Sequence, residues 1–176
     1  MGFAAFLIAV PVGLISQAVL EKRTSITISI GVLLFIILVG IFFDVVGVAV
    51  TAAQETPLHS RAANRVFGAR RAASLVRNAH QVASFCNDVV GDVSGTLSGA
   101  ISIAILYQLF QLTSPLQAIL TMALMSAVVA ALIVGGKAYG KVYAIRRSTE
   151  IVMIVGQVLT FAERLVQRLL PHRSHR

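Results

Sequence analysis

The feature that most constrains this chain is a long stretch without any acidic or basic side chain. From Val93 to Gly136 the sequence runs for 44 residues without Asp, Glu, Lys, Arg or His. A helix needs about 20 predominantly apolar residues to cross about 30 Å of hydrocarbon, so this stretch is long enough for two crossings. A polar segment from Gln108 to Pro115 lies inside it. The pattern predicts two transmembrane helices joined by a short turn.

Two further uncharged stretches, Met1 to Leu20 and Thr24 to Phe43, extend this prediction to four spans. We expect them over about residues 3 to 20, 28 to 54, 84 to 110 and 116 to 140. A signal peptide is the alternative for the first span, but no Lys or Arg precedes its apolar core and no small-x-small cleavage site lies near Leu20. With 57% hydrophobic residues, the sequence predicts an all-α membrane protein.

Basic residues are distributed unevenly between the predicted loops, and this predicts the orientation. Five arginines lie between the second and third spans, and eight Lys or Arg residues lie from Lys137 onward. Only Lys22 and Arg23 lie between the first two spans. By the positive-inside rule, the arginine-rich segment and both termini face the cytoplasm of a multi-pass protein of the cell membrane. The net charge of +8 is thereby explained by topology, and we expect no nucleic-acid partner.

Two segments outside the spans have the pattern of helices at the cytoplasmic membrane surface. Between residues 57 and 82, apolar residues recur at helical spacing with arginines on the other side, which predicts a basic amphipathic helix. A solvated helical hairpin is the alternative. Residues 148 to 170 predict a second interfacial helix, followed by a disordered tail. The chain then divides into an additional N-terminal helix and loop (1 to 27), a transmembrane domain (28 to 145), and an interfacial helix with tail (146 to 176).

Three aspartates lie within or near the predicted spans, where a charge costs roughly 3 kcal/mol on insertion scales. These are Asp44, Asp88 and Asp92. Together with Asn87 and Ser94 they could supply the oxygen ligands that a hard divalent cation prefers. The alternative is that Asp88 lies at the headgroup level and that Asp44 pairs with a neighbouring polar group. Lys137 could either reach the membrane surface or neutralise one of the aspartates.

The third span also carries small residues at a regular spacing. Gly91, Gly95 and Gly99 are four residues apart, which predicts close helix packing and favours a homodimer. Cys86 is the only cysteine, and we interpret it as packing material. The sequence has no His or Cys cluster with metal-ligand spacing. Because no nucleophile and base pair is visible either, we expect no enzymatic activity.

Three segments of the chain carry motifs whose order and spacing are informative. Residues 132 to 152 hold an apolar run that leads through Gly-Gly-Lys-Ala-Tyr-Gly-Lys into a further helix, residues 68 to 78 begin Gly-Ala-Arg-Arg-Ala, and residues 42 to 44 read Phe-Phe-Asp. Together they resemble the transmembrane domain of the CNNM/CorC family of magnesium and cobalt transport proteins. The corresponding family motifs are Gly-Glu-x-x-Pro-Lys, Gly-Ala-Lys-Arg-Ala-Leu and Phe-Phe-Ser. The resemblance covers about residues 28 to 170, and it implies a divalent cation transporter without the nucleotide-binding CBS pair of relatives.

The departures from the family pattern concern the ion site. Lys137 aligns with the family's transport-site glutamate, Gly140 aligns with its proline, and its Gly-Asn-Asn-x-x-Asn motif aligns near residues 89 to 94 without the amides. We therefore expect divergent transport or binding of divalent cations, with magnesium as the candidate ion and Lys137 and Gly140 altering the site. The alternative is a non-transporting scaffold or partner subunit that kept the fold. Beyond the lipid bilayer, the expected partners are a second copy or another membrane protein.

Overall fold

The computed structural model describes residues 2–21, 26–109 and 115–169, and in these ranges the chain is helical with short connections. The prediction of an all-α protein is confirmed. The predicted turn at residues 110 to 114 and the predicted tail lie outside the described residues. In chain order the elements are α1 (Gly2–Glu21), α2 (Ile26–Ala52), α3 (Glu55–Ala63), α4 (Ala69–Arg77), α5 (Ala79–Ser84), the π-helix η1 (Phe85–Val90), α6 (Gly91–Leu109), α7 (Pro115–Arg146) and α8 (Ser148–Leu169).

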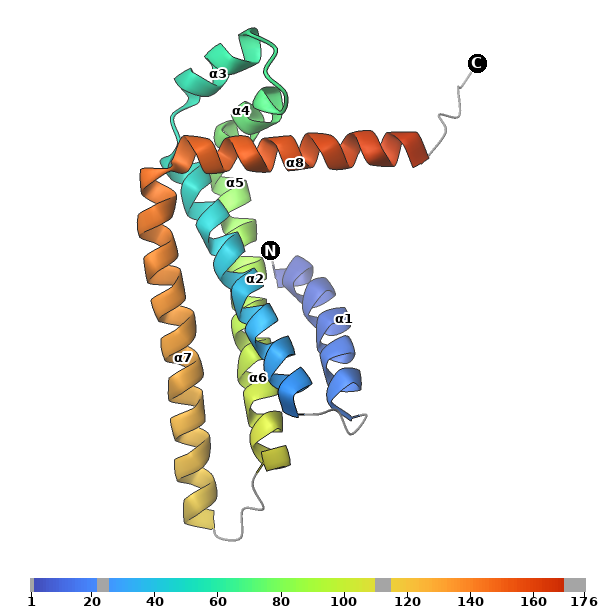
Figure 1. Ribbon diagram of the computed structural model, residues 1–176, viewed down its shortest axis with the longest axis vertical. Helices are drawn as coiled ribbons and strands as arrows, with labels where there is room; N and C mark the ends of the chain where they lie inside the picture. Colours follow the sequence, from blue (N-terminus) through green and yellow to red (C-terminus); the bar gives the residue numbers. More distant parts are fainter. Residues whose placement is uncertain (1, 22–25, 110–114, 170–176) are drawn as a thin grey trace.

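Among the described residues, three helical stretches are long and apolar enough to cross a membrane. They are Ile26–Ala52, Ala79–Leu109 and Leu116–Arg146, and they correspond to the second, third and fourth predicted spans. The apolar helix Gly2–Leu14 is shorter, so the first of the four predicted spans, over residues 3 to 20, stays a prediction. Figure 1 shows α2, α6 and α7 running lengthwise, and all three pairs among them are in contact.

In the part of the chain that the structure describes, the apolar core has two parts, and α2 contributes to both. In one part, Leu33 and Ile37 of α2 pack with Ile105 of α6 and Val129 of α7. The other part surrounds the C-terminal end of α2 and includes buried residues of α3, α4, η1, α7 and α8. Its buried members are Val46, Ala49, Val50, Leu58, Ala69, Ala72, Ala73, Val76, Cys86, Ala144, Val152 and Met153. The helix α2 is therefore the axis around which the other elements are arranged.

The segment between α2 and the next span differs from the single amphipathic helix that we expected. It forms two short helices, α3 and α4, which pack against each other. Arg65 and Gly68 in the connection have φ angles of 55° and 80°, and a residue in this left-handed region ends a right-handed helix. The helical hairpin, which was the alternative, describes the segment better. The residues from Ala79 onward belong to the long apolar stretch.

The last helix, α8, lies across the end of α2, α5 and α7 in Figure 1, with α3 and α4 on its far side. It packs against α4 and α2, and two glycines permit the close approach to α4. A Cβ atom on Gly156 would lie 2.7 Å from the Gly68 carbonyl oxygen and 2.8 Å from the Ala72 backbone nitrogen. The hairpin and α8 therefore form a compact layer at one end of the long helices.

Candidate functional site

Among the described residues, Asp44 is the buried carboxylate of the apolar bundle. It lies on α2 after a run of apolar residues, and it is 3% exposed. A charge removed from water in this way is costly unless other charged or polar groups compensate for it. The surroundings of Asp44 therefore decide what this part of the protein can do.

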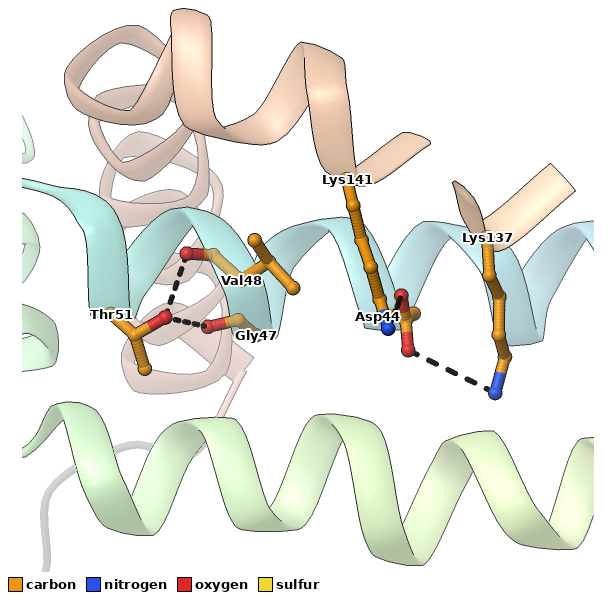
Figure 2. Close-up of polar contacts among 6 residues, drawn as sticks. All are labelled: Asp44, Gly47, Val48, Thr51, Lys137 and Lys141. Carbon is orange, nitrogen blue, oxygen red and sulfur yellow. Dashed lines mark hydrogen bonds and ion pairs between the residues drawn. The ribbon is translucent and has the colours of Figure 1, made fainter. Parts of the chain in front are cut away.

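Two lysines of α7 flank this carboxylate. Lys137 Nζ lies 3.8 Å from Asp44 Oδ1, and Lys141 Nζ lies 3.8 Å from Asp44 Oδ2. Figure 2 shows the Asp44 carboxylate of α2 with both lysine side chains extending towards it. The side chain of Lys137 is 22% exposed and that of Lys141 is 50% exposed. One acid between two ammonium groups leaves a local charge of about +1.

Glycines allow the three long helices to approach one another around these charges. A Cβ atom on Gly91 of α6 would lie 3.3 Å from Lys137 Nζ, so a larger residue would crowd the ammonium group. On α7, a Cβ atom on Gly136 would overlap Ile41, and one on Gly140 would lie 2.6 Å from Val45 Cγ2. The glycine at 140 thus has a packing role against α2. This contact brings Lys137 and Lys141 to the level of Asp44.

Asn87 lies in the π-helix η1 and packs against the next turn of α2. A Cβ atom on Gly47 would overlap the Asn87 side chain, so a larger residue there would have to displace Asn87. Asn87 Oδ1 and Asp44 Oδ2 are buried, and neither accepts a hydrogen bond from a described residue. Buried polar atoms without a partner are uncommon in folded proteins and require an explanation. π-Helical turns are also frequent at functional sites.

The other predicted ligands have different surroundings. Asp88 and Asp92 are exposed, and Asp88 accepts a hydrogen bond of 2.6 Å from Ser84 Oγ. Ser94 is buried, but its hydroxyl group donates to the Val90 carbonyl oxygen at 2.7 Å. The described residues contain no group of three or more His, Cys, Asp or Glu side chains that could hold a metal ion. Metal binding by the predicted set stays a prediction.

The space beside Lys137 is small. A cavity of about 10 Å³ lies between α2, α6 and α7 and is lined by Gly40, Gly91, Gly95 and Ser94 as well as Lys137. Such a volume is at the lower limit for one water molecule. A Cβ atom added to Gly95 or Gly99 would have no atom of another helix within 4 Å, so this part of the glycine series is open in the described chain. Their predicted role in a dimer remains a prediction.

Lys141 was missing from the sequence-based set of site residues. The signal for it was present, because residues four apart share one face of a helix and Lys141 follows Lys137 by four residues. An aspartate inside an apolar span also requires a compensating charge. The two observations together would have added Lys141 to Lys137 as a candidate counter-charge for an aspartate within the spans.

Comparison of the chain with protein-family models, with curated proteins and with solved structures finds no match.

Proposed function

We propose that this chain is a membrane scaffold or partner subunit of CNNM/CorC-like design, in which its own lysines take the position of a divalent cation. The observation that carries the proposal is the arrangement of Lys137 and Lys141 on opposite oxygens of Asp44, each at 3.8 Å. Both oxygens thereby face an ammonium group. A divalent cation at the same carboxylate would raise the local charge from about +1 to about +3.

The size of the neighbouring cavity supports the same proposal. Magnesium binds at about 2.0–2.1 Å with octahedral geometry and usually keeps several of its water molecules. The cavity of about 10 Å³ beside Lys137 has no room for such an ion and its water. Binding would require displacement of a lysine and separation of the helices. A scaffold needs neither change, because its buried charges are compensated within the chain.

Transport of a divalent cation through an altered site is the second candidate, and one observation favours it. Asp44 Oδ2 and Asn87 Oδ1 are buried oxygen atoms without a hydrogen-bond donor among the described residues. Lys141 is half exposed, so its side chain has room to turn away from the carboxylate. These two oxygens would then be available to a cation that carries its remaining ligands as water. In this candidate the lysines control access to the site.

Calorimetric titration of the purified protein with magnesium chloride separates the two candidates. The scaffold proposal predicts no saturable binding by the wild type, and it predicts that Lys137→Glu creates binding, because that change replaces a positive charge beside Asp44 with a second carboxylate. Arg146→Glu is the matched control. It makes the same change of charge on α7 at an exposed residue that forms no ion pair with the described chain, and it should create no binding.

Saturable binding by the wild type that disappears in Asp44→Asn and Asn87→Ala would reject the scaffold proposal in favour of the transporter. Equal binding by the wild type and Lys137→Glu would mean that Lys137 lies outside the ion site. Magnesium flux into proteoliposomes provides the functional measurement for each variant. A scaffold gives the same flux as protein-free vesicles, whereas the second candidate requires a flux that depends on Asp44.

The exposed faces of the long helices support an assembly role. Only 6% of the most apolar part of Leu116–Arg146 is buried within the chain, against 50% for Ala79–Leu109. Lipid, a second copy or another membrane protein must cover this surface. For a second copy, we propose a homodimer through the glycine face of α6, because a Cβ atom on Gly95 or Gly99 would meet no described atom of another helix within 4 Å. Chemical crosslinking in native membranes tests this arrangement. A species that remains monomeric at all crosslinker concentrations would reject the homodimer.

The proposed orientation puts α3, α4 and α8 at the cytoplasmic face of the cell membrane. It rests on the excess of basic residues in these segments. Single cysteines at Ser60 and Thr113, in a Cys86→Ala background, would measure it through a membrane-impermeant thiol reagent. The cysteine at residue 60 should react only after the membrane is opened, whereas that at 113 should react in intact cells. The reverse pattern would invert the topology.

A further inference from the structure

A large cavity lies outside the Asp44 region, between the α3–α4 connection and α8. Its volume is about 590 Å³, which falls within the range of ordinary ligand pockets, about 300–1,000 Å³. We call it the arginine cavity. Its lining residues are Ala62, Arg65, Val66, Phe67, Gly68, Arg70, Arg71, Ser74, Thr160 and Arg164.

Four of these residues are arginines, and they are not neutralised to the same extent. Arg71 forms an ion pair of 2.6 Å with Glu163, and the Arg164 guanidinium group lies 4.7 Å from the centre of the Phe67 ring. Arg65 and Arg70 form no ion pair with any described residue. Four positive charges against one carboxylate make the cavity strongly attractive to an anion.

The backbone adds to this charge and fixes the shape of the wall. Gly68 and Arg70 belong to the start of α4, where the helix dipole contributes a partial positive charge. Gly68 has a φ of 80°, and a Cβ atom there would lie 2.6 Å from the Gln157 backbone nitrogen. Only glycine fits this contact between the start of α4 and α8. The arginines of the two helices are therefore held on a common frame.

A second, apolar cavity adjoins the first. It has a volume of about 180 Å³, and its lining consists of Phe67, Phe161, Arg164 and Leu165. Phe67 and Arg164 thus line both cavities. Phe161 and Leu165 are 63% and 50% exposed, which leaves an apolar surface directly beside a basic one.

Further exposed apolar residues extend this surface along α8. Ile154 and Val158 precede Phe161 and Leu165 at intervals of three or four residues, so the four side chains share one face of the helix. Figure 1 shows α8 lying across the end of the long apolar helices. If those helices span a bilayer, α8 lies at its surface, where headgroups and acyl chains meet.

We propose that the arginine cavity binds the phosphate-containing headgroup of an anionic phospholipid, while the acyl chains lie against Phe161 and Leu165. Arginine guanidinium groups bind phosphate oxygens through paired charge-assisted hydrogen bonds. The adjoining apolar residues favour a lipid over a free phosphate compound, because a free anion would leave them exposed. The site is separate from Asp44, so it is independent of whether the chain carries ions or acts as a scaffold.

The test is native mass spectrometry of the full chain, purified in a neutral detergent and stripped of lipid. Three probes are titrated: dioleoylphosphatidylglycerol, dioleoylphosphatidylcholine and glycerol 1-phosphate. The wild type should bind the phosphatidylglycerol at least about tenfold more tightly than the phosphatidylcholine, since a juxtamembrane basic residue contributes about fivefold in affinity for an anionic lipid. Glycerol 1-phosphate should bind far more weakly than either lipid, because it has no acyl chains to contact the apolar surface.

The double variant Arg70→Gln with Arg164→Gln should lose about 25-fold in affinity for phosphatidylglycerol, at about fivefold for each arginine. It should lose much less in affinity for phosphatidylcholine, because the choline group offsets the charge of that phosphate. The double variant Arg61→Gln with Arg77→Gln is the matched control. It also removes two positive charges, but from arginines of α3 and α4 that do not line the cavity. It should bind like the wild type. Arg70→Gln alone disrupts no ion pair among the described residues, so this variant should fold like the wild type and show the loss of affinity by itself.

Three outcomes would overturn the proposal. Equal losses in the two double variants would mean that general surface charge attracts the lipid. Equal affinities of the wild type for the two phospholipids would mean that the cavity does not distinguish lipids by the charge of their headgroups. Binding of glycerol 1-phosphate as tight as that of phosphatidylglycerol would assign the cavity to a soluble phosphate compound, with no role for the apolar surface.

Discussion

The Asp44 site and the arginine cavity hold positive charge in opposite ways. Inside the bundle, Lys137 and Lys141 are set against a carboxylate that is 3% exposed. At the end of the bundle, Arg65 and Arg70 are left without an acidic partner in the described chain. One region compensates its charges internally, whereas the other leaves them available to a ligand from outside.

This difference follows from the dielectric surroundings of each region. Among apolar helices an uncompensated charge costs several kcal/mol, so the fold must supply a counter-charge. Near water the cost is small, and unpaired arginines persist without loss of stability. A substitution should therefore affect stability at the first region and ligand binding at the second.

The largest effect is expected for Asp44→Asn. The change leaves the two lysine ammonium groups of α7 without a counter-charge, and removing one partner of a buried ion pair costs about 3–5 kcal/mol. Because Lys137 and Lys141 are partly exposed, we expect a loss near the lower end, about 3 kcal/mol. Thermal unfolding in detergent measures it.

Asp92→Asn is the matched control for that experiment. Asp92 is exposed and forms no ion pair with a described residue, so its replacement should change stability by less than about 0.5 kcal/mol. If Asp44→Asn were as stable as Asp92→Asn, the two lysines would not depend on Asp44. The contrast between the two regions would then lose its basis.

A smaller effect is expected for Gly47→Ala. The added methyl group would overlap the Asn87 side chain at the contact between α2 and η1, and overpacking of this kind costs about 1–3 kcal/mol. Gly95→Ala is its control, because a Cβ atom there would have no atom of another helix within 4 Å. Urea or thermal unfolding should show a loss for the first variant and none for the second.

Gly95→Leu adds a test of assembly to this pair. A leucine at this position should weaken a dimer that uses the glycine face of α6. Thermal unfolding of the same variant shows whether the single chain tolerates the larger side chain beside the small cavity between α2, α6 and α7. Analytical ultracentrifugation in detergent measures the association. A dimer that survives the substitution unchanged would mean that Gly95 faces lipid.

A small effect on stability is expected for Glu163→Gln, which tests the arginine cavity instead of the Asp44 site. The ion pair of Glu163 with Arg71 is about half exposed on both sides, and such pairs contribute about 0.2–1 kcal/mol. Removal of the carboxylate should raise the affinity for phosphatidylglycerol about fivefold, since it frees one arginine. An affinity that falls would mean that Glu163 positions Arg71 for the ligand.

Several properties of the site were accessible from the sequence, and others were not. The position of Asp44 in an apolar helix predicted that it would need a polar partner, and Lys137 was identified as a residue that could neutralise an aspartate. Which aspartate Lys137 meets depends on the rotation of α7 against α2. That rotation is set by the contacts of Gly136 and Gly140 with Ile41 and Val45, which no local pattern reveals.

The segment that forms α3 and α4 likewise could be predicted only in part from the sequence. Its alternation of arginines and apolar residues predicted helix, but it left a continuous helix and a hairpin open. The break depends on left-handed backbone at Arg65 and Gly68, and the Gly68 conformation is held by contact with α8. The convergence of Arg70 of α4 and Arg164 of α8 on one cavity follows from that contact, although the two arginines lie far apart in the sequence.

By itself the sequence determined that the chain is all-helical, and it located the three long apolar stretches, because length, apolarity and periodicity act within each segment. Tertiary structure alone decided that Asp44 meets two lysines, that Asn87 packs on Gly47 in a π-helix, and that four arginines surround one cavity. Compensation of a charge depends on which helix faces lie together at distances of a few ångströms. Those distances are fixed by close packing between segments far apart in the chain.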